Sequence, residues 1–186
     1  MTVQDILLLG DPQLYTRCTE IRQEDITHMR EVVQDLHDTL TDFRKCHGMG
    51  RAIAAPQIGV LSRLIYVHIT HPVVLINPEL HFKGEAMMEV WDDCMSFPML
   101  LVKVKRYCGC EVTYRDLSWD EHTWSVEGAL SELIQHEYDH LEGILAVSRA
   151  IDERSFCLKS QSHFITDQGI RKIRDASSST GQQYTP

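Results

Sequence analysis

Long apolar runs are missing from this chain of 186 residues. No stretch approaches the roughly 18 consecutive apolar residues that a membrane-spanning helix requires, so we expect no membrane association. The N-terminus also lacks the charged and then apolar segment that precedes the cleavage site of a secretory signal. No internal repeat is visible. Membrane, secreted and repeat proteins are therefore not favoured by this sequence.

Basic residues are in the minority. Lys and Arg number 18 against 27 Asp and Glu, which gives a formal net charge of −9. A chain with this charge has no general field that attracts phosphates, so nucleic acid is not an expected partner. The six cysteines are scattered along the chain. A chain of this length does not need a disulfide framework, and a reducing compartment is the simpler interpretation.

Hydrophobic residues make up 43% of the sequence. A chain of this length can bury roughly 70% of its unfolded surface, which is enough for a real core. We therefore expect a single domain over residues 1–175. Residues 176–186 are polar and rich in Ser, Thr and Gln, and this composition predicts a disordered tail.

Apolar residues at helical spacing predict an amphipathic helix over residues 25–46 and a second over residues 127–141. A third amphipathic stretch is expected within residues 153–174. Strand-like apolar runs lie between the first two helices, at residues 64–69, 73–76, 100–104 and 110–114. This order of helix, strands and helix favours an α+β domain over alternating βαβ units.

The most specific local pattern is His136-Glu137-Tyr138-Asp139-His140. Two histidines four positions apart on a helix share one face, so both imidazoles can bind the same metal ion. Glu137 would lie beside that ion, where it can take a proton from a metal-bound water. The alternative is an exposed, charged helix on which two histidines meet by chance.

A catalytic metal site usually has three protein ligands and one open position for water. Cys94 is a candidate for the third ligand, because a thiolate with two imidazoles suits zinc or ferrous iron. Spacing alone does not select Cys94 over Cys108 or Cys110. These last two cysteines are separated by one residue, which is poor for chelation, and a strand with alternating side chains explains them better.

A third cluster, residues 48–59, is rich in small residues. Small residues allow a backbone to approach a ligand closely. Gln57 adds a neutral amide that can donate a hydrogen bond to a developing oxyanion. The alternative is a glycine-rich turn between a helix and a strand.

Taken together and in order, these three segments resemble the motifs of the peptide deformylases. Gly50-Arg51-Ala52-Ile53-Ala54-Ala55-Pro56-Gln57 is similar to the family's Gly-x-Gly-Leu-Ala-Ala-Pro-Gln. Asp92-Asp93-Cys94-Met95-Ser96 is similar to Glu-Gly-Cys-Leu-Ser. Residues 135–143 match Gln-His-Glu-x-Asp-His-Leu-x-Gly fully, and the likeness covers roughly residues 5–150.

The resemblance implies an α+β fold in which small antiparallel sheets pack around a metal-binding helix. It implies Cys94, His136 and His140 as ligands of one divalent metal ion, Fe(II) first, with Zn(II), Ni(II) or Co(II) as alternatives. Glu137 would be the general acid and base, and Gln57 with the backbone N–H of Met95 would stabilise the oxyanion. The residues expected to contact the substrate are Gly50, Arg51, Ala52, Ile53, Asp93 and Leu133.

The implied activity is removal of the formyl group from the N-terminal formyl-methionine of newly made proteins. N-formylated nascent peptides would be the partners, and association with the ribosome is a further expectation. Such chemistry belongs to the bacterial cytoplasm, or to a mitochondrion or plastid if a presequence has been removed. Two alternatives stay open: a metallopeptidase, and a deformylase-like protein of altered specificity, or without activity, that binds peptides or a partner.

Among the residues that depart from the family pattern or add charge to it, we single out Asp92, Asp93, Ala52 and Arg51. Asp92 is one methylene shorter than the family's glutamate, whose partner is matched here by Arg106. Asp93 and Ala52 replace glycines, and both would be strained if the backbone needs a positive φ. One hypothesis is that Arg51 and Asp93 pair across the cleft and narrow it. Because the metal and acid/base positions are intact, these changes bear on specificity.

Overall fold

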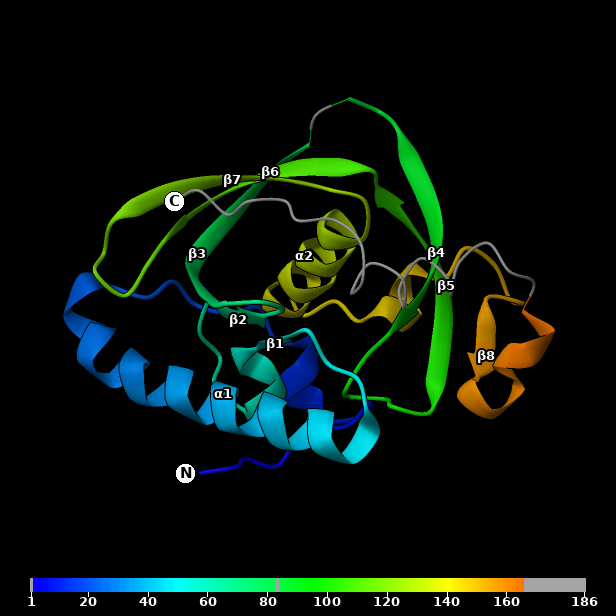
Figure 1. Cartoon of the computed structure of the whole chain (residues 1–186), viewed down its shortest axis with the longest axis horizontal. Helices are drawn as coiled ribbons and strands as arrows, with labels where there is room; N and C mark the ends of the chain where they lie inside the picture. The colour runs from blue at the N-terminus through cyan, green and yellow to red at the C-terminus, as the bar shows by residue number, and fades with distance from the viewer. Residues whose placement is uncertain (1, 83, 166–186) are drawn as a thin grey trace.

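The structure, a computed structural model, describes residues 2–82 and 84–165. It is an α+β arrangement in which two antiparallel sheets surround the helix α2 (Figure 1). The α+β prediction is confirmed. The helices and strands, in chain order, are α1 (Ile26–His47), β1 (Ala52–Ala54), β2 (Leu64–His68), β3 (Pro72–Phe82), β4 (Met87–Asp93), β5 (Leu100–Tyr107), β6 (Gly109–Arg115), β7 (Glu121–Glu127), α2 (Gly128–Leu141) and β8 (Phe156–Leu158).

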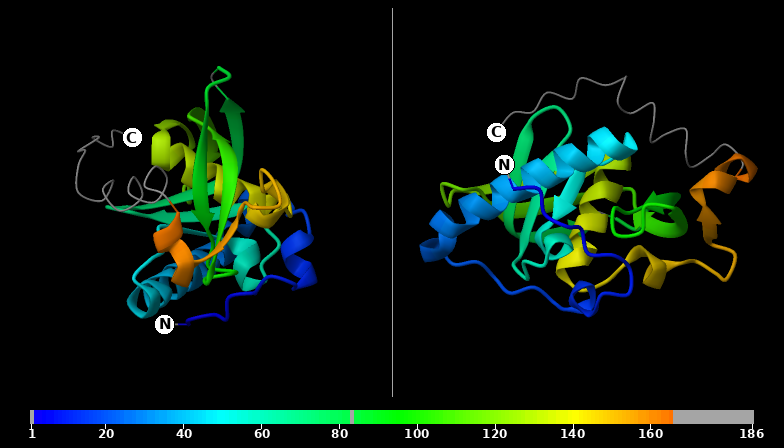
Figure 2. Two further views of the ribbon diagram at one scale, coloured as in Figure 1. Left: turned by 90° about the vertical axis from the view of Figure 1, so that its right-hand side faces the viewer. Right: turned by 90° about the horizontal axis from the view of Figure 1, so that it is seen from below.

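The helix α1 covers one side of the domain. Its apolar stripe, which includes Leu36 and Leu40, is buried against Ile53, Leu64 and Tyr66 of strands β1 and β2. Seen from below, α1 crosses the layer that holds β1 and β2 (Figure 2). The helix ends at Gly48, whose φ of 67° closes the last turn in a left-handed conformation. The chain then turns directly into the glycine-rich segment.

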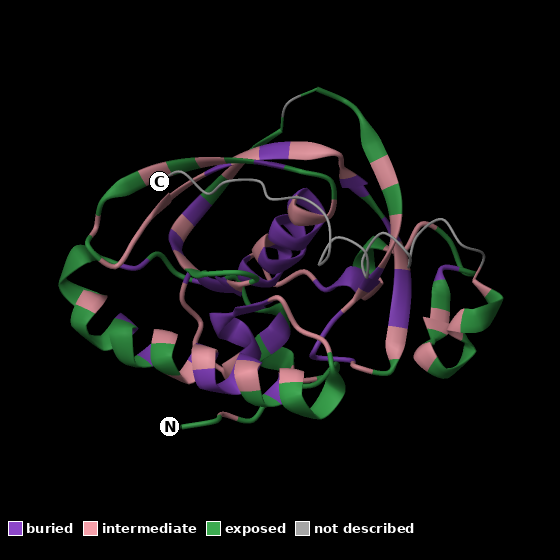
Figure 3. Ribbon diagram, in the orientation of Figure 1, coloured by how far each residue is buried: buried purple, intermediate pink, exposed green. Residues whose placement is uncertain are grey.

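The larger sheet has the strand order β1-β2-β3-β6-β7, and all neighbouring strands are antiparallel. Its inner face packs on α2, where Ile65 and Val112 belong to the same core cluster as Ile134 and Leu141. Most of α2 is buried as a result, whereas α1 shows an exposed outer face (Figure 3). The predicted metal-binding helix is therefore the centre of the fold.

The smaller sheet has the order β4-β5-β8. Strand β4 pairs with β5 along its whole length, from Met87 opposite Tyr107 to Asp93 opposite Leu101. Strand β8 pairs with the other edge of β5. This sheet packs on a separate core that contains Leu14, Val102 and Leu145. Because Cys94 directly follows β4, the sheet carries that cysteine to the middle of the molecule.

The two long helices begin and end within one residue of their predicted limits, and the four predicted strands fall on β2, β3, β5 and β6. The third predicted amphipathic helix, residues 153–174, is wrong in the part that the structure describes. Phe156–Leu158 form β8, because the half-buried Cys157 lies between exposed neighbours, which is the period of a strand on the edge of a sheet. Residues 166–174 and the expected polar tail, 176–186, lie outside the described residues.

Candidate metal centre and active site

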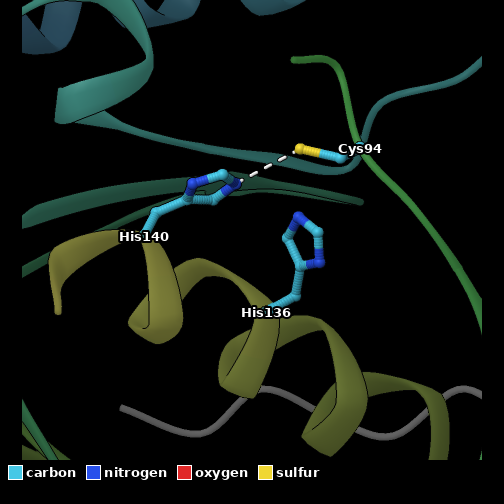
Figure 4. Close-up of side chains that lie close together, drawn as sticks. All are labelled: Cys94, His136 and His140. Carbon is cyan, nitrogen blue, oxygen red and sulfur yellow. Dashed lines mark hydrogen bonds between the residues drawn. The ribbon is translucent and has the colours of Figure 1, made fainter. Parts of the chain in front are cut away.

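Three buried side chains that can ligate a metal converge at the centre of the molecule (Figure 4). Cys94 follows β4, and His136 and His140 lie on successive turns of α2. Their ligand atoms all lie within 4.8 Å of one another, and His140 Nε2 is 3.3 Å from Cys94 Sγ. Within residues 2–82 and 84–165, no other His, Cys, Asp and Glu side chains form such a group. The fold therefore selects Cys94 from the three cysteines that spacing left open.

The other two candidate cysteines lie elsewhere. Cys110 is buried in the core between α2 and the larger sheet, and Ser131 Oγ approaches its sulfur to 3.6 Å. Cys108 is only half-buried. Cys108 lies in the bend between β5 and β6, so the interpretation of this pair as strand side chains holds for Cys110 alone.

The Cys94 sulfur faces hydrogen-bond donors. The backbone N–H of Ser96 donates to it over 3.4 Å, and Gln57 Nε2 lies 3.6 Å away. The thiolate is the form of cysteine that binds metals. A thiolate beside two imidazoles is a donor set that suits zinc or ferrous iron. The residues present thus fit the divalent metal ion expected from the sequence.

Glu137 is buried beside the two histidines, and its Oε2 has no hydrogen-bond partner. Burial raises the pKa of this carboxyl group to about 7, and the nearby His136 opposes that rise. A buried carboxylate without a partner is costly to a fold. Such a residue in a pocket is a candidate for proton transfer.

Gln57 is held in one orientation. Its Oε1 accepts a hydrogen bond of 2.9 Å from the backbone N–H of Ala54. Its Nε2 therefore points the other way, toward Cys94 Sγ and Ser96 Oγ, the latter at 3.3 Å. The amide N–H groups are thus presented at the edge of the metal position.

A pocket opens on this group of residues. It is lined by Met49, Gly50, Arg51, Ala52, Gln57, Asp93, Cys94, Met95, Glu132, Leu133, His136 and Glu137. All but one of the residues predicted to contact the substrate are in this lining. The exception is Ile53, whose side chain is fully buried in the core against α1, so that only its backbone could meet a substrate.

A model of the polypeptide deformylase family matches residues 3–155. The chain belongs to this family. A peptide deformylase is a hydrolase, so the expectation of an enzyme is confirmed. The matched region contains all three glycine, cysteine and histidine motifs and ends just before β8.

Individual relatives agree with the family assignment. The chain is 38% identical over 165 residues to a peptide deformylase of Thermomicrobium roseum, with 83% of this chain and 89% of the relative covered. It is 34% identical over 153 residues to that of Dictyoglomus thermophilum, with 81% and 95% covered. A crystal structure of the Synechococcus elongatus peptide deformylase in complex with actinonin superposes with a TM-score of 0.75 at 28% identity, covering 86% of this chain and 84% of that one.

In this deformylase the shortened Asp92 reaches both of its neighbours. Its Oδ1 lies 2.8 Å from His136 Nδ1, and its Oδ2 accepts a hydrogen bond of 2.8 Å from Arg106 Nη2. Although burial works in the opposite direction, His136 and Arg106 hold the pKa of Asp92 well below its usual range. With Nδ1 directed at Asp92, His136 keeps Nε2 to bind a metal.

The same Arg106 continues into a buried ionic network. Its Nη1 donates to Asp139 Oδ2 on α2. Asp139 also accepts two hydrogen bonds of 2.6 Å from Arg149, which belongs to the turn after α2. The network ties β4, β5, α2 and the following turn together around the metal ligands.

The predicted Arg51–Asp93 pair is wrong. Arg51 Nη2 is 3.1 Å from Glu132 Oε2, and Asp93 Oδ2 is 3.1 Å from Lys159 Nζ. The reason is that α2 presents Glu132 to Arg51, while the chain after β8 brings Lys159 to Asp93. Burial raises the pKa of Glu132 to about 7, helped by Asp92 and opposed by Arg51.

The two replaced glycines do not strain the backbone. Among the described residues, Asn77 and Trp119 are the non-glycine positions with a positive φ, so Ala52 and Asp93 are unstrained. Gly50, by contrast, has a φ of 116°, and a Cβ there would meet Leu40 Cδ1 at 3.1 Å. The first motif therefore needs a glycine at Gly50 and accepts alanine at Ala52.

Sequence reasoning missed two residues of the pocket, Met49 and Glu132. Glu132 is four positions before His136, as His136 is four before His140, so the helical spacing contained the signal. Met49 stands between two glycines and carried no comparable signal.

Proposed function

We propose that this deformylase hydrolyses the formyl group of N-terminal formyl-methionyl peptides, using Cys94, His136 and His140 to hold one divalent metal ion. The observation that carries the proposal is the buried Glu137 carboxylate beside these ligands, on the wall of a pocket, whose Oε2 has no hydrogen-bond partner. A metallopeptidase of the His-Glu-x-x-His kind usually takes its third metal ligand, a histidine or glutamate, from the chain after the helix. The third member of the group here is Cys94, which lies before the helix.

For the metal we propose Fe(II), with Zn(II), Ni(II) or Co(II) able to replace it. The support is the donor set of one thiolate and two imidazoles, which accepts borderline cations. When bound, such a cation supplies Lewis-acid activation of water and of the formyl carbonyl. The remaining work falls to residues of this chain.

We assign the proton transfers to Glu137. Its carboxylate takes a proton from the attacking water and returns it to the amine that leaves. Burial places this group in a dry environment, where its proton affinity is close to that needed near neutral pH. The products are formate and a free amino terminus.

Two donors would stabilise the oxyanion that develops on the formyl oxygen when water adds to the formyl carbon. The Gln57 amide already points toward the Cys94 sulfur, 3.6 Å away. The backbone N–H of Met95, the residue after Cys94, is the second donor we propose. Fixed donors of this kind need no reorganisation during the reaction.

The peptide would bind along the free edge of β1. Strand β1 is the outermost strand of the larger sheet, and the His68 N–H donates to the Arg51 carbonyl from the β2 side. Because backbone groups alternate along an antiparallel strand, the N–H and C=O of Ala52 point to the open side. An extended peptide can add to such an edge through main-chain hydrogen bonds.

The natural substrate would be the formylated nascent peptide, with the ribosome as a place of encounter. The relatives described above come from bacteria. We therefore propose a compartment with bacterial-type translation, namely the bacterial cytoplasm, a mitochondrion or a plastid. No helix in the described part of the chain is long and apolar enough to cross a membrane.

The test is formate release from a formyl-Met peptide by protein loaded with Fe(II) without oxygen, and in parallel with Ni(II) or Co(II). Glu137→Ala is expected to keep the metal and lose most turnover, whereas Glu85→Ala, at an exposed position between β3 and β4, is the matched control. Normal turnover of metal-loaded Glu137→Ala would refute the role of Glu137. No turnover by the fully loaded wild type would favour the non-catalytic alternative.

A further inference from the structure

Glu132 places a third ionisable side chain in line with the two histidine ligands. Residues 132, 136 and 140 are spaced by four, so they occupy one face of α2. Glu132 is 4% exposed and lines the same pocket as His136 and Glu137. A carboxylate therefore forms part of the wall next to the metal position.

Arg51 covers this carboxylate from the side of β1. Its Nη2 lies 3.1 Å from Glu132 Oε2, and its Nη1 lies 3.5 Å from the carbonyl oxygen of Ala129. The side chain of Arg51 is 27% exposed and that of Glu132 only 5%. The guanidinium thus lies toward the mouth of the pocket and the carboxylate deeper inside. The pocket wall presents hydrogen-bond donors and acceptors side by side.

Two further residues of the wall are suited to an aliphatic stem. Met49 and Leu133 line the pocket beside the ion pair. A formyl group held at the ligands has the first residue of the peptide directly attached to its nitrogen. The side chain of that residue must therefore lie within one residue's reach of His136, in the part of the pocket that Arg51 and Glu132 form.

We propose that the Arg51–Glu132 pair is the binding site for the side chain of the formylated residue, and that it favours an unbranched side chain ending in a neutral amide over an apolar one of equal length. This inference rests on the proposed function. An amide oxygen can accept from the guanidinium while the amide N–H groups donate to the carboxylate. An apolar chain would displace water from the ion pair and return no hydrogen bond.

Methionine falls between these two cases, since its thioether sulfur is a weak acceptor. Three peptides separate the possibilities: formyl-Gln-Ala-Ser, formyl-Met-Ala-Ser and formyl-norleucyl-Ala-Ser. The glutamine and norleucine side chains are unbranched and similar in length. The ratio of their kcat/KM values reports the polarity of the pocket and is insensitive to the amount of active protein.

The decisive variant is the double substitution Arg51→Leu with Glu132→Leu, which removes the pair without leaving a buried charge unpaired. We expect the glutamine-to-norleucine ratio to fall at least about tenfold, because a site built for hydrogen bonding discriminates strongly against an analogue that lacks them. Arg115→Gln with Glu121→Gln removes a more exposed pair between β6 and β7 and is the control. A change of less than about twofold in the decisive variant would overturn the inference.

Binding separates this inference from the proposed function. Calorimetric titration with the same three peptides, on zinc-loaded Glu137→Ala protein with and without the double substitution, gives dissociation constants, because Glu137→Ala is expected to keep the metal and lose most turnover. If no formate is released but the ratio of these constants still shifts, the proposed function fails and the side-chain site stands. If formate is released but neither the kcat/KM ratio nor the ratio of dissociation constants shifts in the double variant, the proposed function stands and the side-chain site fails. Glu132→Gln, which keeps the shape of the side chain, replaces the double variant if that variant does not fold.

Discussion

Asp92 Oδ1 lies 2.8 Å from His136 Nδ1, and the same carboxylate is hydrogen-bonded to Arg106 through its other oxygen. This contact fixes the imidazole of a metal ligand by way of a residue that touches no metal itself. The aspartate is shorter than the glutamate of the family motif. The shorter side chain still makes both contacts because the C-terminal end of β4 meets α2 at His136, and Arg106 reaches Asp92 from the neighbouring strand β5.

Replacing Asp92 with asparagine should weaken metal binding by roughly 10–100-fold, the usual effect of losing a carboxylate that orients a ligating histidine. The measurement is competition for Zn(II) against a chromophoric chelator. Asp42→Asn, at an exposed position on α1, should leave the affinity unchanged. Equal affinities for the Asp92 variant and wild type would show that His136 is oriented by the helix alone.

Arg106→Met should destabilise the fold by about 3–5 kcal/mol, because it leaves buried carboxylates without their shared cation. Arg106 is 2% exposed and sits between Asp92 and Asp139. Urea unfolding of the metal-free protein gives the value. Lys103→Met, on the same strand but in a half-exposed pair with Glu89, is the control and should cost less than about 1 kcal/mol. A small loss at Arg106 would mean that Arg149 alone satisfies Asp139.

Gln57→Ala should lower kcat by roughly 10²–10³, the typical effect of removing one oxyanion donor. We expect KM to change little, since the donor acts on charge that develops only in the transition state. Steady-state kinetics with a formyl-Met peptide provide both constants, and Gln34→Ala on the exposed side of α1 is the control. A rise in KM at unchanged kcat would place Gln57 in ground-state binding instead.

We expect the loss of activity in peroxide to parallel the oxidation of Cys94. Oxidation of the other described cysteines should not parallel it. Burial raises the pKa of Cys18 to about 11 and also raises that of Cys110, so both stay protonated and unreactive near neutral pH. Cys46 is exposed and should be modified without loss of activity. Mass spectrometry of peptides at successive stages of inactivation makes the assignment. Full protection of activity in a Cys46→Ser variant would contradict it.

The main elements of the fold follow from the sequence because their periodicity is strong. The helix α1 buries residues at spacings of three and four, and α2 combines the same spacing with the histidine motif. Strands β1, β4 and β7 were not predicted. In β4 and β7 buried or half-buried residues alternate with exposed ones over much of the strand and charges intervene, and β1 has only three residues. Their pairing partners are distant in the sequence.

The two histidines of the metal-binding group follow from their spacing on the helix, whereas Cys94 was indicated only by the resemblance to the family motif, because chemistry and spacing left three cysteines open. The ion pairs at the pocket could not be predicted. Arg51 and Asp93 are oppositely charged and close in sequence to the motifs. The sequence does not show whether they pair with each other or, as in the structure, with Glu132 and Lys159 respectively. That choice depends on the rotation of α2 about its axis and on where the chain passes after β8, both of which are set by packing at a distance.

The strand β8 begins after residue 155, where the match to the family ends. It nevertheless pairs with β5, and Lys159 beyond it contacts Asp93 at the pocket. The folded domain therefore extends at least to Lys159, beyond residue 155, where the match to the family ends. An expression fragment that ends at residue 155 would lack β8 and leave an edge of β5 unpaired. Unpaired strand edges promote aggregation, so we expect such a fragment to aggregate.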